Sequence, residues 1–191
     1  MVEDPRGNLK FSPDGTKLAI ANASGGLFLA DFDSESGTVT NTQRLNINSA
    51  NYAAYGVEFS PNNRVLDSAS SNNEDSRLGA GNHFSSLIQY DLEATDINAS
   101  QVSLDESGYY RGSLQLGPDG KIYRALSLAY EEGLNSLGVI ENPNALGTAA
   151  NYNDQAIDLG TGVSYQGLPP FNQSLFNELD IIQNSISTTQ L

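Results

Sequence analysis

Short apolar segments alternate with polar turns along the chain, and a proline-led turn recurs between two such segments. Its three copies span residues 9–15 (LKFSPDG), 57–63 (VEFSPNN) and 114–120 (LQLGPDG). Proline presets φ for the second position of a type I turn, and Gly or Asn tolerates the positive φ that completes the reversal. Each copy is therefore predicted to be a β-hairpin, and three copies indicate a repeat protein.

A second pattern recurs in phase with these turns. An apolar stretch that ends in an acidic residue follows each hairpin, and a more polar stretch comes after it. Each unit therefore holds about four short strands, of which the last faces more water, as in a β-propeller blade. The acid-terminated strands lie at 26–32, 86–92 and 136–141, and the outer strands at 38–45, 101–104 and 155–159.

These units predict an all-β fold, a partial β-propeller of about three four-stranded antiparallel blades plus the start of a fourth. Successive turn prolines are 48 and 57 residues apart, which suits a blade with loop insertions. Because a ring needs at least four blades, we expect the chain to belong to a longer polypeptide with further blades and a downstream domain. The alternative is that several chains complete one ring. The predicted blades span 7–50, 55–106 and 110–160, the fourth begins at 165–176, and 177–191 is a linker.

The composition excludes several classes of binding partner and of stabilising site. The 191 residues carry a formal net charge of −14, which disfavours nucleic acid and anionic membranes. The chain has no cysteine, so it has neither a disulfide nor a thiolate zinc site. No apolar run is long enough to span a membrane, and residues 1–6 do not form a signal peptide.

Several longer runs resemble one family, the propeller region of large secreted Bacteroidota proteins. The most specific are 114–125 (LQLGPDGKIYRA) and 166–171 (QGLPPF), supported by 9–19, 55–62 and 82–87. Such proteins carry a C-terminal sorting domain of the type IX secretion, gliding-motility-associated class. The resemblance covers nearly the whole chain and implies an extracellular or cell-surface location. It supplies no catalytic residues.

The insertion in the second unit is the first candidate for ligand binding. Long loops on rigid scaffolds often carry binding residues, and this one contains the only histidine. A solvated loop with a locally hydrogen-bonded His83 is the alternative. Arg111, among tyrosines 109, 110, 123 and 130, suits sugar or peptide recognition, or else a buried ion pair. The candidate ligand-binding residues are Asn72, Asn73, Glu74, Asp75, His83 and Arg111.

Three alternating carboxylates, Asp31, Asp33 and Glu35, resemble part of a calcium loop. The match to an EF-hand is poor, because its glycine falls at the seventh position and its twelfth residue is Thr42. An ordinary turn between outer strands explains the same residues. No cofactor is predicted, and Ca²⁺ is the ion that these residues would accept.

The sequence favours a non-catalytic binding or scaffolding module that contacts glycan, protein or ions. One alternative is a lactonase-like enzyme whose metal is held by channel carboxylates, for which Glu58, Asp67 and Asp119 are the candidates. The other is a structural spacer. No nucleophile elbow, phosphate loop or zinc-protease motif appears in the sequence.

Overall fold

The computed structural model describes residues 4–72 and 77–170, which form three four-stranded antiparallel sheets. Each sheet follows chain order, so each is a meander, and we call them blades 1, 2 and 3. Blade 1 comprises β1 (Gly7–Phe11), β2 (Lys17–Asn22), β3 (Gly26–Asp33) and β4 (Thr38–Leu45). Blade 2 comprises β5 (Ala53–Phe59), β6 (Val65–Ser71), β7 (Ser85–Asp91) and β8 (Val102–Ser107). Blade 3 comprises β9 (Leu114–Leu116), β10 (Ile122–Ala129), β11 (Glu132–Ile140) and β12 (Tyr152–Asp158).

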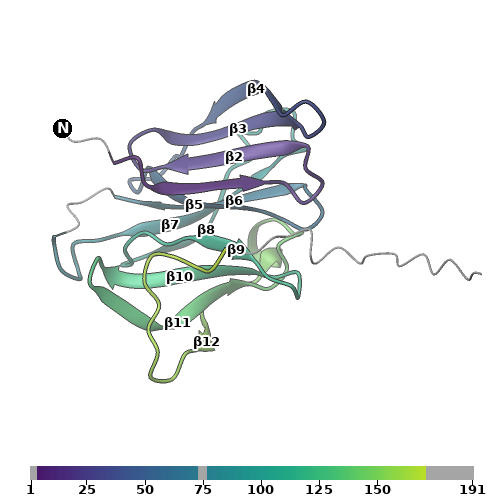
Figure 1. Cartoon of the computed structure of the whole chain (residues 1–191). Helices are drawn as coiled ribbons and strands as arrows, with labels where there is room; N and C mark the ends of the chain where they lie inside the picture. Colours follow the sequence, from purple (N-terminus) through teal and green to yellow (C-terminus); the bar gives the residue numbers. More distant parts are fainter. Residues whose placement is uncertain (1–3, 73–76, 171–191) are drawn as a thin grey trace, which may run out of the picture.

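The blades stack face to face in chain order (Figure 1). One apolar cluster lies between blades 1 and 2, where Leu27 and Leu29 meet Phe59 and Ile88. A second cluster lies between blades 2 and 3, where Leu87 meets Leu114 and Ile122. The first strands β1, β5 and β9 lie next to one another in turn. This arrangement is that of consecutive propeller blades and confirms the predicted fold class.

The three proline turns form the predicted hairpins. In blade 1 the Ser12 amide donates to the Lys17 carbonyl at 3.0 Å, and Gly15 adopts φ 71°. In blade 2 Asn63 takes the place of that glycine with φ 63°, and in blade 3 Gly120 does so with φ 77°. The prolines and the left-handed residues therefore account for all three reversals through local chemistry.

Glycine allows the chain to pass closely from one blade to the next. A Cβ on Gly56 of β5 would lie 2.4 Å from the carbonyl oxygen of Gly112, in the segment that leads into blade 3. Gly112 is also close to its own blade, because a Cβ on it would lie 2.0 Å from the Ala125 carbonyl oxygen of β10. Continuing the same path, the Ser113 amide donates to the Gln166 carbonyl at 2.8 Å. The segment that follows blade 3 therefore runs beside the start of β9, just as the segment before β9 runs beside β5.

The described part of the predicted fourth unit, 165–170, forms no strand, and Ser164 makes an isolated bridge to Leu134. Residues 171–176 and the predicted linker 177–191 lie outside the described residues. Within 4–72 and 77–170, the one helical segment is a short 3-10 turn at Gly147–Ala150. A helix long and apolar enough to cross a membrane is not found in this part of the chain.

Candidate functional site

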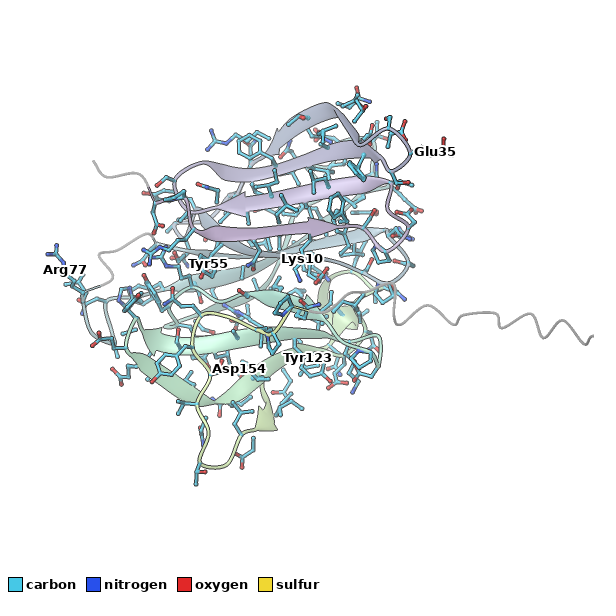
Figure 2. All side chains as sticks on the ribbon, viewed as in Figure 1. Lys10, Glu35, Tyr55, Arg77, Tyr123 and Asp154 are labelled. Carbon is cyan, nitrogen blue, oxygen red and sulfur yellow. The ribbon has the colours of Figure 1, made fainter. Side chains whose placement is uncertain are left out.

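The stacked blades have two ends, and side chains of different character gather at each. One end carries the proline turns. The other carries the starts of β1 and β5, the segment that leads into β9, and the turns after β2, β6 and β10. In Figure 2 the labelled Tyr55 and Arg77 lie at this second end, and Tyr123 lies toward the proline turns. We call the second end the loop face.

Arg111 is the centre of the loop face. Its side chain is 5% exposed, and its Nη1 donates to the Asp4 carboxylate at 2.5 Å. Its Nη2 donates to the Tyr110 hydroxyl, and its guanidinium lies 5.4 Å from the centroid of the Tyr55 ring. Segments from three blades therefore meet at one buried arginine, which the sequence offered either as a ligand contact or as a buried ion pair. The geometry is that of the ion pair.

Asp4 connects this buried arginine to an exposed one. Its carboxylate accepts from Arg6 Nε at 2.7 Å as well as from Arg111. The hydrogen bond from Arg6, followed by that from Arg111, holds the pKa of the Asp4 carboxyl well below its usual range. Arg6 in turn lies 6.0 Å from the centroid of the Tyr130 ring, which is 43% exposed.

A cleft of about 590 Å³ opens beside Tyr130. Its walls are the turn between β10 and β11 on one side and the loop before β7 on the other. Both signs of charge and one aromatic ring border it, so it suits a polar ligand that also has apolar faces. The lining residues are Arg77, Leu78, Gly79, Ala129, Tyr130, Glu131 and Glu132.

The insertion candidates have structural roles where they are described. Asn72 closes the base of its loop, because its Nδ2 donates to the Asn82 carbonyl at 2.9 Å and its backbone amide to the Phe84 carbonyl at 3.0 Å. His83 is fully buried, with Nε2 2.9 Å from the Leu78 carbonyl and its ring 4.5 Å from Tyr110. Asn73, Glu74 and Asp75 lie outside the described residues.

The three predicted metal candidates do not converge on a metal site. Asp33 caps the turn by accepting from the amides of Glu35 and Ser36 at 2.9 and 3.2 Å. Asp31 accepts from Lys17 at 3.0 Å and from the Asn41 amide at 2.7 Å. No group of three or more His, Asp or Glu side chains among the described residues is placed to hold a metal ion. The turn interpretation accounts for these acids.

Addition of Ca²⁺ is therefore expected to leave the melting temperature unchanged, because Asp31 and Asp33 already have protein partners. Differential scanning calorimetry in millimolar Ca²⁺ and in EDTA measures this directly. A ligand at about 100 times its Kd adds about 2.7 kcal/mol, which would raise the melting temperature by several degrees. A rise of that size would contradict the turn interpretation.

Two of the three channel carboxylates do meet. Glu58 and Asp67 are cross-strand partners on β5 and β6, and both are fully buried. Glu58 accepts from Lys10 Nζ at 2.9 Å and from the Leu116 amide at 3.0 Å, so residues from three blades meet at it. Asp119 lies apart in its exposed turn and accepts from the Tyr123 hydroxyl at 2.9 Å.

Asp67 has no hydrogen-bond partner for either carboxylate oxygen within the described part of the chain. Burial raises its pKa to about 8; the Gln89 amide opposes this rise, and the neighbouring Glu58 adds a smaller rise. The Gln89 side chain also bonds to blade 3, where its Nε2 donates to the Ala145 carbonyl at 3.3 Å and its Oε1 accepts from the Gly147 amide at 3.0 Å. The Glu58–Asp67 pair is thus a buried interblade element, which solvent does not reach.

Arg124 makes a further polar contact between blades 2 and 3. Its side chain is 1% exposed, and it donates to Asp105 at 2.8 Å, Ser85 at 2.7 Å and the Tyr152 hydroxyl at 3.1 Å. Arg124 and Asp105 thus form a buried ion pair with further hydrogen bonds to the guanidinium.

Asp4 and Arg6 were missed as site residues by the sequence analysis. The signal was an Asp and an Arg two residues apart immediately before the first strand, but their partners lie more than 100 positions away. Only the stacking of the blades brings them to Arg111 and Tyr130.

No protein-family model matches the chain, and no curated protein matches it. Among solved structures, the chain is similar to Kuenenia stuttgartiensis hydrazine synthase, at 19% identity and a TM-score of 0.46 over 73% of this chain and 33% of that one. A putative 6-phosphogluconolactonase from Bacteroides fragilis gives 18% identity and a TM-score of 0.45 over 73% and 35%. A β-propeller domain from Myceliophteria thermophila gives 13% identity and a TM-score of 0.37 over 70% and 38%. The chain thus spans about a third of the length of each.

Proposed function

We propose that this chain is a non-catalytic binding module of an exported, multidomain surface protein of the type IX secretion class, and that its loop face binds a glycan. Export, the surface location and the other domains of the polypeptide follow from the sequence resemblance. The observation that carries the binding proposal is the cleft beside Tyr130, with Arg6 against that ring and Arg77 on the opposite wall.

The chemistry of the cleft favours a sugar. Sugars present apolar C–H faces to aromatic rings and hydroxyls to charged and amide groups, and a tyrosine combines an apolar body with a polar tip. The Glu131 and Glu132 carboxylates can accept hydrogen bonds from sugar hydroxyls, and the guanidinium groups can donate hydrogen bonds to sugar oxygens. The ring is held in place by Arg6, which Asp4 fixes through two hydrogen bonds at 2.7 and 2.9 Å. A fixed ring loses little conformational entropy when it binds.

The buried Glu58–Asp67 pair fits a lactonase-like metal site less well than the cleft fits a glycan. A positive charge is already supplied to Glu58 by Lys10 at 2.9 Å, and Asp119 is remote from the pair. Both carboxylates of the pair are fully buried, whereas a catalytic metal keeps a position open for substrate.

Replacement of Tyr130 by alanine is expected to weaken glycan binding at least tenfold, because the stacking surface of the cleft is lost. Arg6→Ala should have a smaller effect in the same direction, since it frees the ring without removing it. Glycan-array screening of the intact chain identifies a ligand, and isothermal titration then compares the variants.

Tyr123→Ala is the matched control. Tyr123 lies near the proline turns, bonded to Asp119, at the end of the blades remote from the cleft. Binding that survives in Tyr130→Ala, or that falls equally in Tyr123→Ala, would place the ligand elsewhere.

A further inference from the structure

Arg44 differs from the other basic side chains of the described residues, because it has no carboxylate partner among them. Within 4–72 and 77–170 it makes neither an ion pair nor a hydrogen bond, although the chain carries 23 acidic and 9 basic residues. Arg77 is engaged as well. An exposed guanidinium left unpaired in so acidic a chain is available to an external anion. The basic residues that form ion pairs are Arg6, Lys10, Lys17, Arg64, Arg111, Lys121 and Arg124.

Arg44 borders a pocket of about 300 Å³ on the loop face, between the turn that follows β2 and the segment that leads from β4 into β5. Its guanidinium lies across Gly26, where a Cβ would be only 3.0 Å from Nη2 and 3.1 Å from Nε. The lack of a side chain at Gly26 therefore gives the guanidinium its place. Arg44 is the one charged residue in the lining of this pocket, so the pocket itself is positive.

The opposite wall of the pocket is fixed to blade 2 through its main chain. The Asn46 amide donates to Asn98 Oδ1 at 2.7 Å, and the Asn48 amide donates to Gln101 Oε1 at 2.9 Å. The Asn46 carbonyl accepts from Gln101 Nε2 at 2.7 Å. The side-chain amides of Asn46 and Asn48, in contrast, make no hydrogen bond within the described part of the chain. They can therefore bind a ligand without first breaking a contact.

Tyr52 gives the pocket an aromatic surface. Its side chain is 59% exposed, whereas the neighbouring Asn51 is buried and donates from Nδ2 to Ser86 Oγ at 2.9 Å. The buried amide thus anchors the main chain beside the exposed ring. A guanidinium pairs with a carboxylate, side-chain amides bind hydroxyls, and an aromatic ring packs on the C–H face of a sugar. Together these groups suit a sugar that carries a carboxylate.

A preceding blade does not cover the position of Arg44 on the fourth strand, as blade 2 shows. Arg44 pairs with Phe28, and Ser103 of β8 pairs with Ile88 of β7; Phe28 and Ile88 each lie three residues before an aspartate near the proline turn. Ile88 packs against blade 1, yet Ser103 is exposed. The pocket beside Arg44 therefore stays open when blade 1 has a neighbour on that side.

We propose that this pocket is a second binding site of the loop face and that it takes a uronic acid, with the carboxylate on Arg44 and the sugar ring on Tyr52. A pocket of this size is at the lower end of ligand pockets and suits about one sugar ring. The proposal does not rest on the Tyr130 cleft, whose lining includes Glu131 and Glu132 and disfavours an acidic sugar.

Titration of the intact, ¹⁵N-labelled chain with digalacturonate, followed by NMR, tests the proposal. We expect saturable shifts of the amides of Gly26 and residues 46–52, with a Kd on the order of 1 mM. Salt at about 100 mM shortens the Debye length to about 10 Å, so the remote carboxylates of this acidic chain do not mask the contact. The methyl ester of the same sugar should bind roughly tenfold more weakly, because it keeps the ring and loses the charge.

Arg44→Gln should weaken digalacturonate binding roughly tenfold and leave binding of the ester unchanged, a difference that damage to the fold would not produce. Tyr52→Ala should weaken both ligands alike, because ring packing does not depend on the charge. Arg64→Gln is the matched control. The Arg64 side chain is 42% exposed, but it lies near a proline turn and pairs with Asp91 at 3.1 Å, so this variant should bind both ligands as the wild type does.

Equal affinity for the acid and its ester, or an unchanged affinity in Arg44→Gln, overturns the proposal. A chain that shows no shift at the pocket up to about 20 mM digalacturonate overturns it as well. Glycylglycine represents the other source of a carboxylate, and binding as tight as that of digalacturonate would overturn the assignment to a sugar. Tyr130→Ala should not change binding of the uronate, whereas it should weaken binding in the Tyr130 cleft, so the two proposals can fail separately.

Discussion

Lys10→Met is expected to lower the free energy of unfolding by about 3–5 kcal/mol, the usual cost of removing one partner of a buried ion pair. Lys10 Nζ lies 2.9 Å from Glu58 Oε2 and donates to Gln115 Oε1 at 2.6 Å. Without the ammonium, the fully buried Glu58 carboxylate loses this cationic partner, while the amides of Phe59 and Leu116 still donate to it. Chemical denaturation of both proteins at pH 7 measures the difference.

The second half of that experiment separates the charge from the packing. Glu58→Gln in the Lys10→Met background should restore part of the lost stability, because it removes the buried charge that Lys10 had balanced. Lys17→Met is the matched control. Its partner Asp31 is 3.0 Å away, but the two side chains are 33% and 45% exposed, and such pairs contribute at most about 1 kcal/mol. A loss in Lys10→Met no larger than that in Lys17→Met would show that the three-blade junction contributes little.

Local chemistry made the strands and turns predictable. Proline and a residue that tolerates positive φ occupy each reversal, and the apolar strands around them alternate in a recognisable way. The expected outer strand 38–45 coincides with β4, and the acid-terminated strand 26–32 lies within β3. The repeat also made the stacking of the three sheets predictable, because each repeated sheet carries apolar residues on both faces and must cover them.

The site was less predictable because its contacts join distant parts of the chain. Arg111 was selected for its tyrosine neighbours, yet its carboxylate partner Asp4 is 107 residues away. His83 was selected as the single histidine, and burial against Tyr110 gives it a packing role instead. Glu58 and Asp67 carried no local signal of burial. Only the strand register places the two carboxylates opposite each other.

The same register leads to the second large effect, which is a loss of stability as pH rises through the neutral range. Burial raises the pKa of Asp67 to about 8 in the folded protein from 3.8. Between these two values the folded protein holds a proton at Asp67 that the unfolded chain has released, so raising the pH favours unfolding. The contribution is fully present below about pH 4 and is lost as the pH rises through about 8. Over that window the loss is on the order of 5 kcal/mol.

Asp67→Asn removes this titration, so its free energy of unfolding should exceed that of the wild type by a margin that grows from pH 5 to pH 8. Urea denaturation at each pH gives the margin, and taking the difference cancels the carboxylates common to both proteins. Asp119→Asn, in an exposed turn, is the control and should track the wild type across the range.

A margin that stays constant with pH would mean that Asp67 is ionised in the folded protein. The space between blades 2 and 3 would then have to hold two adjacent negative charges beside Lys10, and Lys10→Met would become the more damaging of the two changes at high pH.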